Sequence, residues 1–181
     1  MQARSGQPYN LQISGDVANL KGSAAAIGTY ERPNIISDPF TAGPVASNPD
    51  PLCAKTISQG GHAADAVRTT ATFFNPCAFA VPNGTFGNLG RNAFRGKPVY
   101  NVDFSMFKSI PLPHEGWNVQ LRFEAFNVFN IQNWDVPSPT NNTNLVVNSS
   151  ATAINPGAGA ITGLAAGTNP RQLQFGLRFA F

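Results

Sequence analysis

The last ten residues of the chain alternate strictly between apolar side chains and polar or small ones. One face would carry Leu173, Phe175, Leu177, Phe179 and Phe181, and the other would carry Gln172, Gln174, Gly176, Arg178 and Ala180. A period of two is the signature of a β-strand. The length fits the roughly 9–11 residues of a tilted strand that crosses a bilayer, whereas strands of soluble proteins most often have about five or six. The pattern predicts a transmembrane strand over 172–181.

Two upstream segments, 98–109 and 117–129, repeat this alternation. Their apolar faces would hold Tyr100, Val102, Phe104 and Met106, and Val119, Leu121, Phe123 and Ala125. The opposite faces would hold Asn101, Asp103 and Ser105, and Gln120, Arg122 and Glu124. In a barrel wall the apolar set contacts lipid and the polar set faces a wet lumen. The alternation breaks at Phe126, which predicts a bulge or the point where the strand leaves the membrane.

The connections between these strands differ in length. Residues 109–116 contain two prolines and a glycine, which predicts a short hairpin turn. The segments 14–97 and 130–171 have no sustained period, and 7–13 alternates only in part, as the outer end of another strand would. Outer-membrane barrels have short periplasmic turns and long extracellular loops. We therefore predict an all-β fold, in which antiparallel C-terminal strands of an incomplete transmembrane barrel carry long extracellular loops, with local folding in 14–97.

Composition supports a membrane barrel over a soluble helical protein. The 181 residues include 15 Pro and 17 Gly, and only 12% of them are charged. The net charge of +3 is spread along the chain rather than clustered, so nucleic acid is not an expected partner. Residues 1–6 lack the apolar stretch of a secretory signal, and there is room for only a few wall strands. The chain is therefore expected to be a fragment of a larger receptor.

The two cysteines, Cys53 and Cys77, lie in the first long loop. In an oxidising compartment such a pair predicts a disulfide, which would stabilise this segment by about 3 kcal/mol. The alternative is two unpaired thiols. A zinc site is not expected, because no nearby set of ligands has the usual spacing.

No catalytic, cofactor or metal site is expected from the remaining residues. His62 and His114 both lie in turn-like sequence, outside any known catalytic motif. The glycine-rich stretch 84–90 lacks the spacing and the following lysine of a phosphate-binding loop. The chain is therefore not expected to be an enzyme.

Several motifs, in their order and spacing, resemble the end of TonB-dependent receptors. They are Glu31–Asn34, Phe74–Phe79, Gly84–Asn92, Phe94–Gly96, Asn101–Ser105, Arg122–Asn130, Pro170–Phe175 and the terminal Phe181. In particular they look like the large Oar-like receptors of acidobacteria, which carry a carboxypeptidase-regulatory-like domain at their N-terminus. The resemblance covers residues from about 31 to 181.

The resemblance implies a bacterial outer-membrane barrel of 22 strands with an N-terminal plug, importing ligands with energy passed through TonB. This chain contains neither a plug nor a TonB box, so it would not transport alone and would meet TonB only through the missing N-terminal part. Its partners would be the rest of the barrel and plug, the lipid bilayer, and the barrel-assembly machinery. In this family that machinery recognises the last strand, here at Phe175, Leu177, Phe179 and Phe181.

A second interpretation is an all-β binding or adhesion protein, in the outer membrane or secreted, without transport. Trp117 and Trp134 would then stack on a carbohydrate. A soluble form of this kind would need its apolar strand faces packed against each other. The positions of Tyr100, Trp117, Phe129 and Trp134 near strand ends favour the membrane, where aromatic side chains form girdles at both interfaces.

Overall fold

The computed structural model describes residues 1–18, 31–114, 116–138, 142–147 and 153–181. Residue 115 of the expected hairpin turn, and the parts 19–30, 139–141 and 148–152 of the expected long loops, lie outside the described residues. The regular structure consists of β-strands and three short 3-10 helices. No helix among the described residues is long and apolar enough to cross a membrane.

The chain divides into two compact units, each made of segments that are far apart in sequence. Unit 1 contains residues 1–6, 97–134 and 164–181. Unit 2 contains residues 7–96 and 135–163. Each unit is described by itself.

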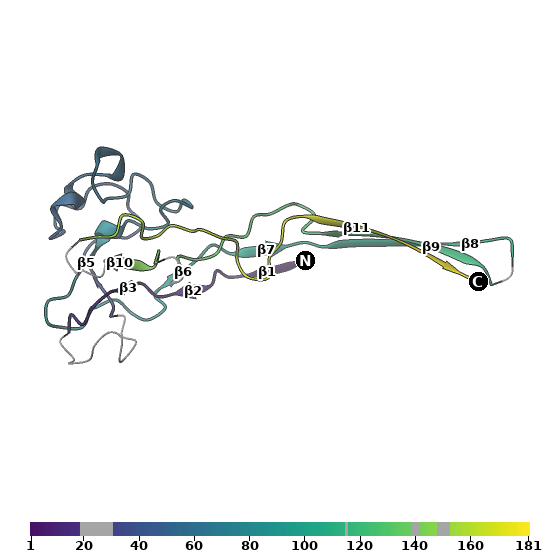
Figure 1. Cartoon of the computed structure of the whole chain (residues 1–181), viewed down its shortest axis with the longest axis horizontal. Helices are drawn as coiled ribbons and strands as arrows, with labels where there is room; N and C mark the ends of the chain where they lie inside the picture. The colour runs from purple at the N-terminus through teal and green to yellow at the C-terminus, as the bar shows by residue number, and fades with distance from the viewer. Residues whose placement is uncertain (19–30, 115, 139–141, 148–152) are drawn as a thin grey trace. The chain divides into compact units, whose positions relative to one another are not determined.

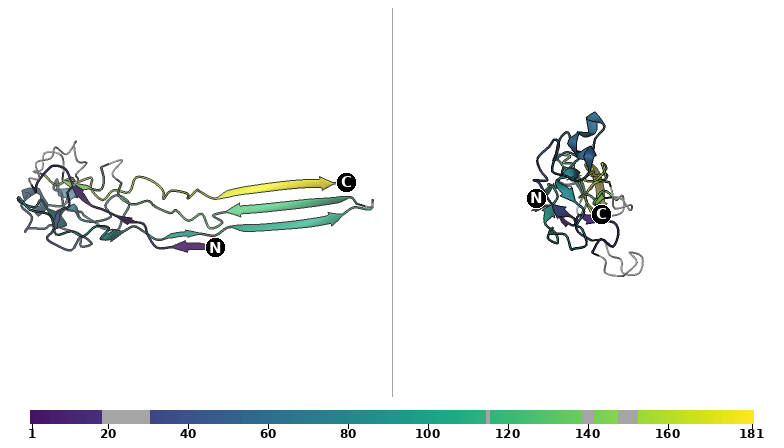
Figure 2. Two further views of the ribbon diagram at one scale, coloured as in Figure 1. Left: turned by 90° about the horizontal axis from the view of Figure 1, so that it is seen from below. Right: turned by 90° about the vertical axis from the view of Figure 1, so that its left-hand side faces the viewer.

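The main element of unit 1 is a three-stranded antiparallel sheet with the order β11-β9-β8 (Figures 1 and 2). Its strands are β8 (Phe104–Pro111), β9 (Asn118–Phe126) and β11 (Gln172–Ala180). The register is continuous along both ladders, so that Met106, Phe123 and Phe175 are direct neighbours across the sheet. The alternating sequence forms this sheet because each strand places all its apolar side chains on one side.

The segment 98–109, expected as one strand, is two strands in the structure. β7 (Val99–Asn101) pairs with β1 (Gln2–Arg4), and β8 begins only at Phe104. The break lies at Asp103, whose carboxylate accepts hydrogen bonds from the Asn101 side chain and from the backbone N–H of Asn127. Such bonds from a short polar side chain compete with the regular ladder.

The strand expected over 117–129 ends at Phe126. No bulge occurs, because the register with both neighbours stays regular to this residue. Asn127 and Asn130 both have positive φ, 50° and 51°, and the backbone N–H of Asn130 donates to the carbonyl of Asn127. A tight turn therefore ends the strand, as expected for asparagine in the left-handed region.

Unit 2 is built from short strand pairs. β2 (Pro8–Tyr9) pairs with β6 (Phe94–Arg95), and β4 (Asn34–Ile35) pairs with β5 (Phe79–Ala80). β3 (Gln12–Ile13) runs parallel to β10 (Leu145–Val147). The expected strand over 7–13 is thus two strands of two residues with different partners. The 3-10 helices are η1 (Pro51–Ala54), η2 (Ile57–Gln59) and η3 (Pro76–Ala78).

The core of unit 2 is aromatic and is closed by a disulfide. Phe74 packs edge-to-face on Phe79, with ring centroids 5.6 Å apart, and Phe79 packs in the same way on Phe94 at 5.9 Å. Cys53 and Cys77 are joined in a disulfide, so of the two alternatives for the cysteines the bonded one is observed, and both residues are fully buried. The long loops expected from the sequence therefore contain a folded core of their own.

A buried asparagine holds this core together. The Asn75 side chain donates to the carbonyls of Thr41 and Gly43, and its Oδ1 accepts from the backbone N–H groups of Ala64 and Cys77. All the donors and acceptors of this amide are therefore used, and backbone groups that would otherwise be buried without a partner are satisfied.

Candidate membrane-spanning sheet and polar pocket

The sheet of β8, β9 and β11 has one apolar face. Register and alternation place on it Phe104, Met106 and Ile110 of β8, Val119, Leu121, Phe123 and Ala125 of β9, and Leu173, Phe175, Leu177 and Phe179 of β11. The side chains of Phe175 and Leu177 are 76% and 72% exposed. Lys108 is the one charged residue on this face, three positions before the end of β8, where a long side chain can extend toward an interface.

The other face is polar. Ser105, Glu124 and Gln174 are neighbours across the three strands, followed by Ser109, Gln120 and Arg178. Arg122 donates to Glu124 at 2.6 Å along β9. Of the six residues expected to face the lumen, Ser105, Gln120, Arg122 and Glu124 lie on this face, whereas Asn101 and Asp103 precede β8 and line the pocket described below. Two aromatic residues, Phe107 and Phe126, also lie on the polar face.

Aromatic side chains gather at both ends of the sheet. At the hairpin end, Trp117 packs edge-to-face on Phe179 at 5.4 Å and contacts His114 at 5.1 Å, and Phe179 contacts Phe181 at 5.8 Å. Phe181 follows the end of β11 and is exposed. Phe129 lies exposed beyond the other end, past the turn that follows β9. This distribution is typical of the two aromatic girdles of a membrane barrel.

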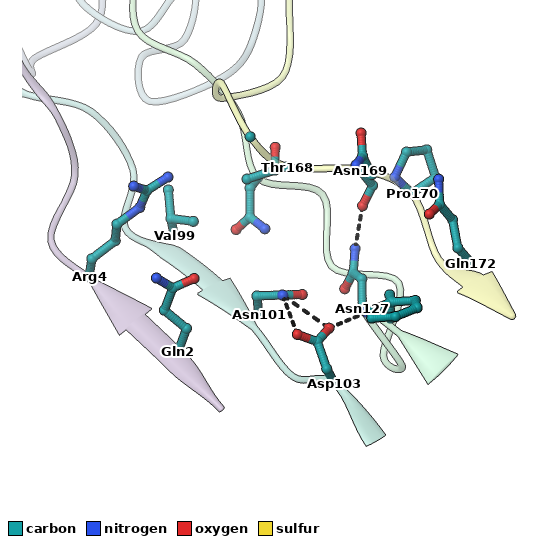
Figure 3. A pocket seen from close by; sticks show the side chains of 13 residues that line it. Gln2, Arg4, Val99, Asn101, Asp103, Asn127, Thr168, Asn169, Pro170 and Gln172 are labelled. Carbon is teal, nitrogen blue, oxygen red and sulfur yellow. Dashed lines mark hydrogen bonds between the residues drawn. The ribbon is translucent and has the colours of Figure 1, made fainter. Parts of the chain in front are cut away.

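A pocket of about 220 Å³ lies at the end of the sheet opposite the hairpin (Figure 3). Five parts of unit 1 enclose it: β1, β7 with the following Asp103, the end of β9 with Asn127, Asn133, and the stretch 167–172. The lining residues are Gln2, Arg4, Val99, Asn101, Asp103, Phe126, Asn127, Asn133, Gly167, Thr168, Asn169, Pro170 and Gln172.

Two buried asparagines fix the walls of this pocket. The Asn127 side chain donates to the carbonyls of Ile131 and Asn169 at 3.0 and 2.9 Å, which ties the turn after β9 to the stretch before β11. The Asn133 side chain accepts from the backbone N–H of Tyr100 and donates to its carbonyl, at 2.9 and 2.8 Å. Asn133 therefore pairs with β7 much as a strand residue would, and its side chain fixes this wall of the pocket.

Residues 1–174 match the family model described as the outer membrane beta barrel domain. The chain belongs to this family. No curated protein and no solved structure matches the chain.

Membership of the outer membrane beta barrel family explains the two faces of the sheet. A protein of this family places an apolar face against lipid and keeps polar side chains on the inside. The nine residues of β9, at about 3.3 Å each, span about 30 Å, and a tilt of about 45° reduces this to roughly 21 Å across the membrane, close to the height of the apolar band of such barrels.

The described strands of this outer-membrane protein do not close into a barrel. β8 and β11 are the two outer strands of the sheet, and each has one edge without a strand partner among the described residues. The soluble alternative required apolar faces packed against each other, and the exposure of Phe175 and Leu177 does not fit it.

The histidines lie in structural positions. His62 Nδ1 is 2.9 Å from Asp50 Oδ2, and the same carboxylate accepts from the backbone N–H groups of Ile154 and Leu52. Burial raises the pKa of Asp50, but these hydrogen bonds and His62 outweigh it and lower the pKa below its ordinary value. His114 packs on Trp117 in the hairpin turn.

The glycine-rich stretch 84–90 is used for backbone packing. A Cβ added at Gly87 would lie 1.9 Å from the carbonyl oxygen of Arg32, so only glycine allows this close approach of two backbone segments. Among the described residues, no group of three or more His, Cys, Asp or Glu side chains could hold a metal ion.

The sequence did not predict the pocket, because Gln2 and Arg4 come from a segment to which no element had been assigned. One signal was present. Phe126, where the alternation of β9 breaks, is an aromatic residue on the polar face of the sheet and lines the pocket.

Proposed function

We propose that this chain forms part of the wall and the extracellular loops of a TonB-dependent outer-membrane transporter of the Oar-like type. The observation that carries the proposal is the open sheet of β8, β9 and β11, which has a face for lipid, a polar face and, among the described residues, two edges without a strand partner. Such a sheet requires further strands, because an unpaired strand edge is not tolerated inside a bilayer. The order of the receptor-like motifs supports the finer assignment to TonB-dependent receptors.

The two units would have different tasks in this transporter. Unit 1 supplies the wall strands and, on its polar face, part of the lumen lining, including Ser105, Gln120, Arg122 and Glu124. Unit 2, with its own core and disulfide, supplies folded extracellular loops. The rest of the barrel and the plug would complete the pore, and TonB would act through the plug. The chain by itself would not transport.

The last strand would also serve assembly of the barrel. Phe175, Leu177 and Phe179 stand on one face of β11, and Phe181 follows its end, so their side chains are available to the barrel-assembly machinery. Substituting Phe181 by alanine should lower the amount of folded protein in the outer membrane, measured by its heat-modifiable mobility on gels. Gln174→Ala, on the other face of the same strand, is the matched control. Equal folded amounts for both variants would contradict the assembly role.

The experiment that tests the transporter assignment is to read the DNA upstream of the Met1 codon. An open frame, continuous or interrupted by a frameshift, that encodes earlier strands, a plug and a TonB box would support it. A separate promoter behind an unrelated gene would overturn it, and an outer-membrane binding or adhesion protein without transport would replace it.

A further inference from the structure

The pocket in unit 1 offers polar groups without an excess of charge. Arg4 and Asp103 are the only charged residues that line it, and their formal charges cancel. The side chains of Gln2, Arg4, Asn169 and Gln172 make no hydrogen bond within the part of the chain that the structure describes, and these four residues line the pocket together with Asn101 and Asp103. These groups are available to a ligand.

The chemistry of these groups selects neutral hydroxyl-bearing ligands. A carboxamide offers a donor and an acceptor side by side, a carboxylate accepts and a guanidinium donates, and a hydroxyl group can satisfy each of them. An anion would meet Arg4 but also the carboxylate of Asp103. A metal ion would find a single carboxylate, already engaged by Asn101 and Asn127.

Phe126 gives the pocket an apolar wall. It lies on the polar face of β9, opposite Gln172, and its side chain is 41% exposed. An exposed aromatic ring among convergent polar groups suits a ligand with polar edges and an apolar face, because the ring can pack against C–H groups while the edges are hydrogen-bonded. The break in the alternation of β9 at Phe126 thus places an aromatic ring in the wall of the pocket.

The volume favours a small ligand. The pocket holds about 220 Å³, which is below the approximately 300 Å³ at which pockets for drug-sized ligands begin, and it suits a ligand of about one ring. We propose that this pocket binds a single neutral sugar unit, stacked on Phe126 and hydrogen-bonded by Arg4, Asn101, Asp103 and Gln172. The buried Asn127 and Asn133 preform the walls, which lowers the entropy lost on binding.

As a ligand subsite, the sugar pocket rests on the proposed transporter function, since it would lie on the lumen side of the wall. The test measures binding and not transport, so the two proposals can fail separately. If no sugar binds, the pocket proposal fails, and the transporter assignment is still tested independently by the DNA sequence upstream of Met1. Sugar binding without an upstream plug would describe an outer-membrane sugar-binding protein.

The experiment is a titration of the full chain, folded in detergent micelles, with the methyl glycosides of glucose, galactose and mannose. Binding is followed by NMR of the side-chain amide groups of Asn and Gln. At least one glycoside should give saturable shifts at Asn101 and Gln172. Phe126→Ala and Gln172→Ala should each weaken its affinity by tenfold or more. Unchanged backbone shifts at the hairpin end of β9, from Asn118 to Arg122, show that the variants are folded.

The matched controls are Phe107→Ala and Gln174→Ala, which remove the same residue types from the same polar face outside the pocket. Both should bind the sugar as the wild type does. The proposal is overturned if no glycoside gives saturable shifts, or if the controls weaken binding as much as the pocket variants. It is also overturned if inorganic phosphate or a blocked dipeptide shifts the same amides and the glycosides do not.

Discussion

The sheet of unit 1 and the core of unit 2 use apolar side chains in opposite ways. In unit 2 the large aromatic residues Phe74 and Phe79 are fully buried against each other. Along β8, β9 and β11, Ala125 is the one buried residue, while the side chains of Phe175 and Leu177 are exposed. The fold of unit 2 is therefore suited to water, whereas the apolar face of the sheet is suited to the lipid bilayer.

The comparison shows where each unit obtains its stability. Unit 2 buries its own apolar surface and closes it with a disulfide, as a small domain in water must. The sheet holds its strands by backbone hydrogen bonds and leaves its apolar face to the bilayer. Changes that remove packing should therefore affect unit 2, and changes that disturb contact with lipid should affect the sheet.

The largest effect is expected from Phe74→Ala, which removes a ring at the centre of the unit 2 core. Loss of a buried phenylalanine destabilises by about 3–5 kcal/mol, since a cavity adds to the lost burial. Hydrogen exchange at the backbone amides of Ala64 and Ala78, both bonded to Asn75, should become much faster. Phe86→Ala, at a ring that is 68% exposed, is the control and should change exchange little. Equal effects would show that the core does not stabilise unit 2.

Removing the disulfide should have the next largest effect. The double substitution Cys53→Ala and Cys77→Ala opens a cross-link between residues 24 positions apart, and the chain-entropy relation gives a loss of about 3 kcal/mol. The same two amides report on it, and the amide of Phe123 in β9 serves as the internal control. If exchange at Phe123 rose equally, the two units would unfold together and the contrast between them would fail.

A charge placed on the apolar face should disturb only the sheet in lipid. In a barrel completed by its remaining strands, Leu121→Arg should make folding into lipid vesicles less favourable by roughly 2 kcal/mol, because arginine on the lipid face of a barrel strand is destabilising. Gln120→Arg, at the adjacent position on the polar face, is the matched control. Urea unfolding followed by the fluorescence of Trp117 and Trp134 measures both variants. Equal losses for the two would mean that the face of Leu121 does not contact lipid.

The smallest expected effect is a loss of stability at low pH, when the Asp50 carboxylate becomes protonated. The pKa of Asp50 is lowered in the folded protein, so the stability that its charge contributes is complete above the unfolded value of about 4 and is lost as the pH falls through the folded value. The loss should be on the order of 1 kcal/mol, typical of a residue capping a helix N-terminus as Asp50 caps η1. The fraction of unit 2 that stays folded in the full chain, followed by NMR between pH 6 and 2, measures this loss of stability. Asp50→Asn should remove most of this loss of stability at low pH. An unchanged loss in the variant would exclude the Asp50 carboxylate as its cause.

The sequence predicted the sheet well because its signal is local. Strand residues such as Phe175 and Leu177 repeat every two positions, and this period follows from the pleat of a single strand. The same reasoning joined β7 to β8, because alternation carries no information about Asp103 bonding to Asn127, 24 positions away.

The sequence predicted the disulfide of unit 2 and local folding in 14–97, but not the strand pairing of this unit or the pocket, because their contacts join distant residues through side chains. The strands β2 and β3 have two residues each, too short for any period, and the amide of Asn75 reaches back more than 30 positions to Thr41 and Gly43. The pocket likewise depends on Arg4 meeting residues of β7, β9 and 167–172. Only Phe126 marked it in the sequence.

The division of unit 2 between residues 7–96 and 135–163 also has a consequence for biogenesis. In the sequence, the hairpin of β8 and β9 lies between these two segments. The strands of the wall are therefore synthesised before the second segment of unit 2. Gln12 meets Asn144 across 132 positions, and the parallel pair of β3 and β10 forms only after that return. The disulfide and the Phe74–Phe79 packing lie within the first segment, so they can form before the second arrives, whereas the pair of β3 and β10 closes only after the wall hairpin has been made.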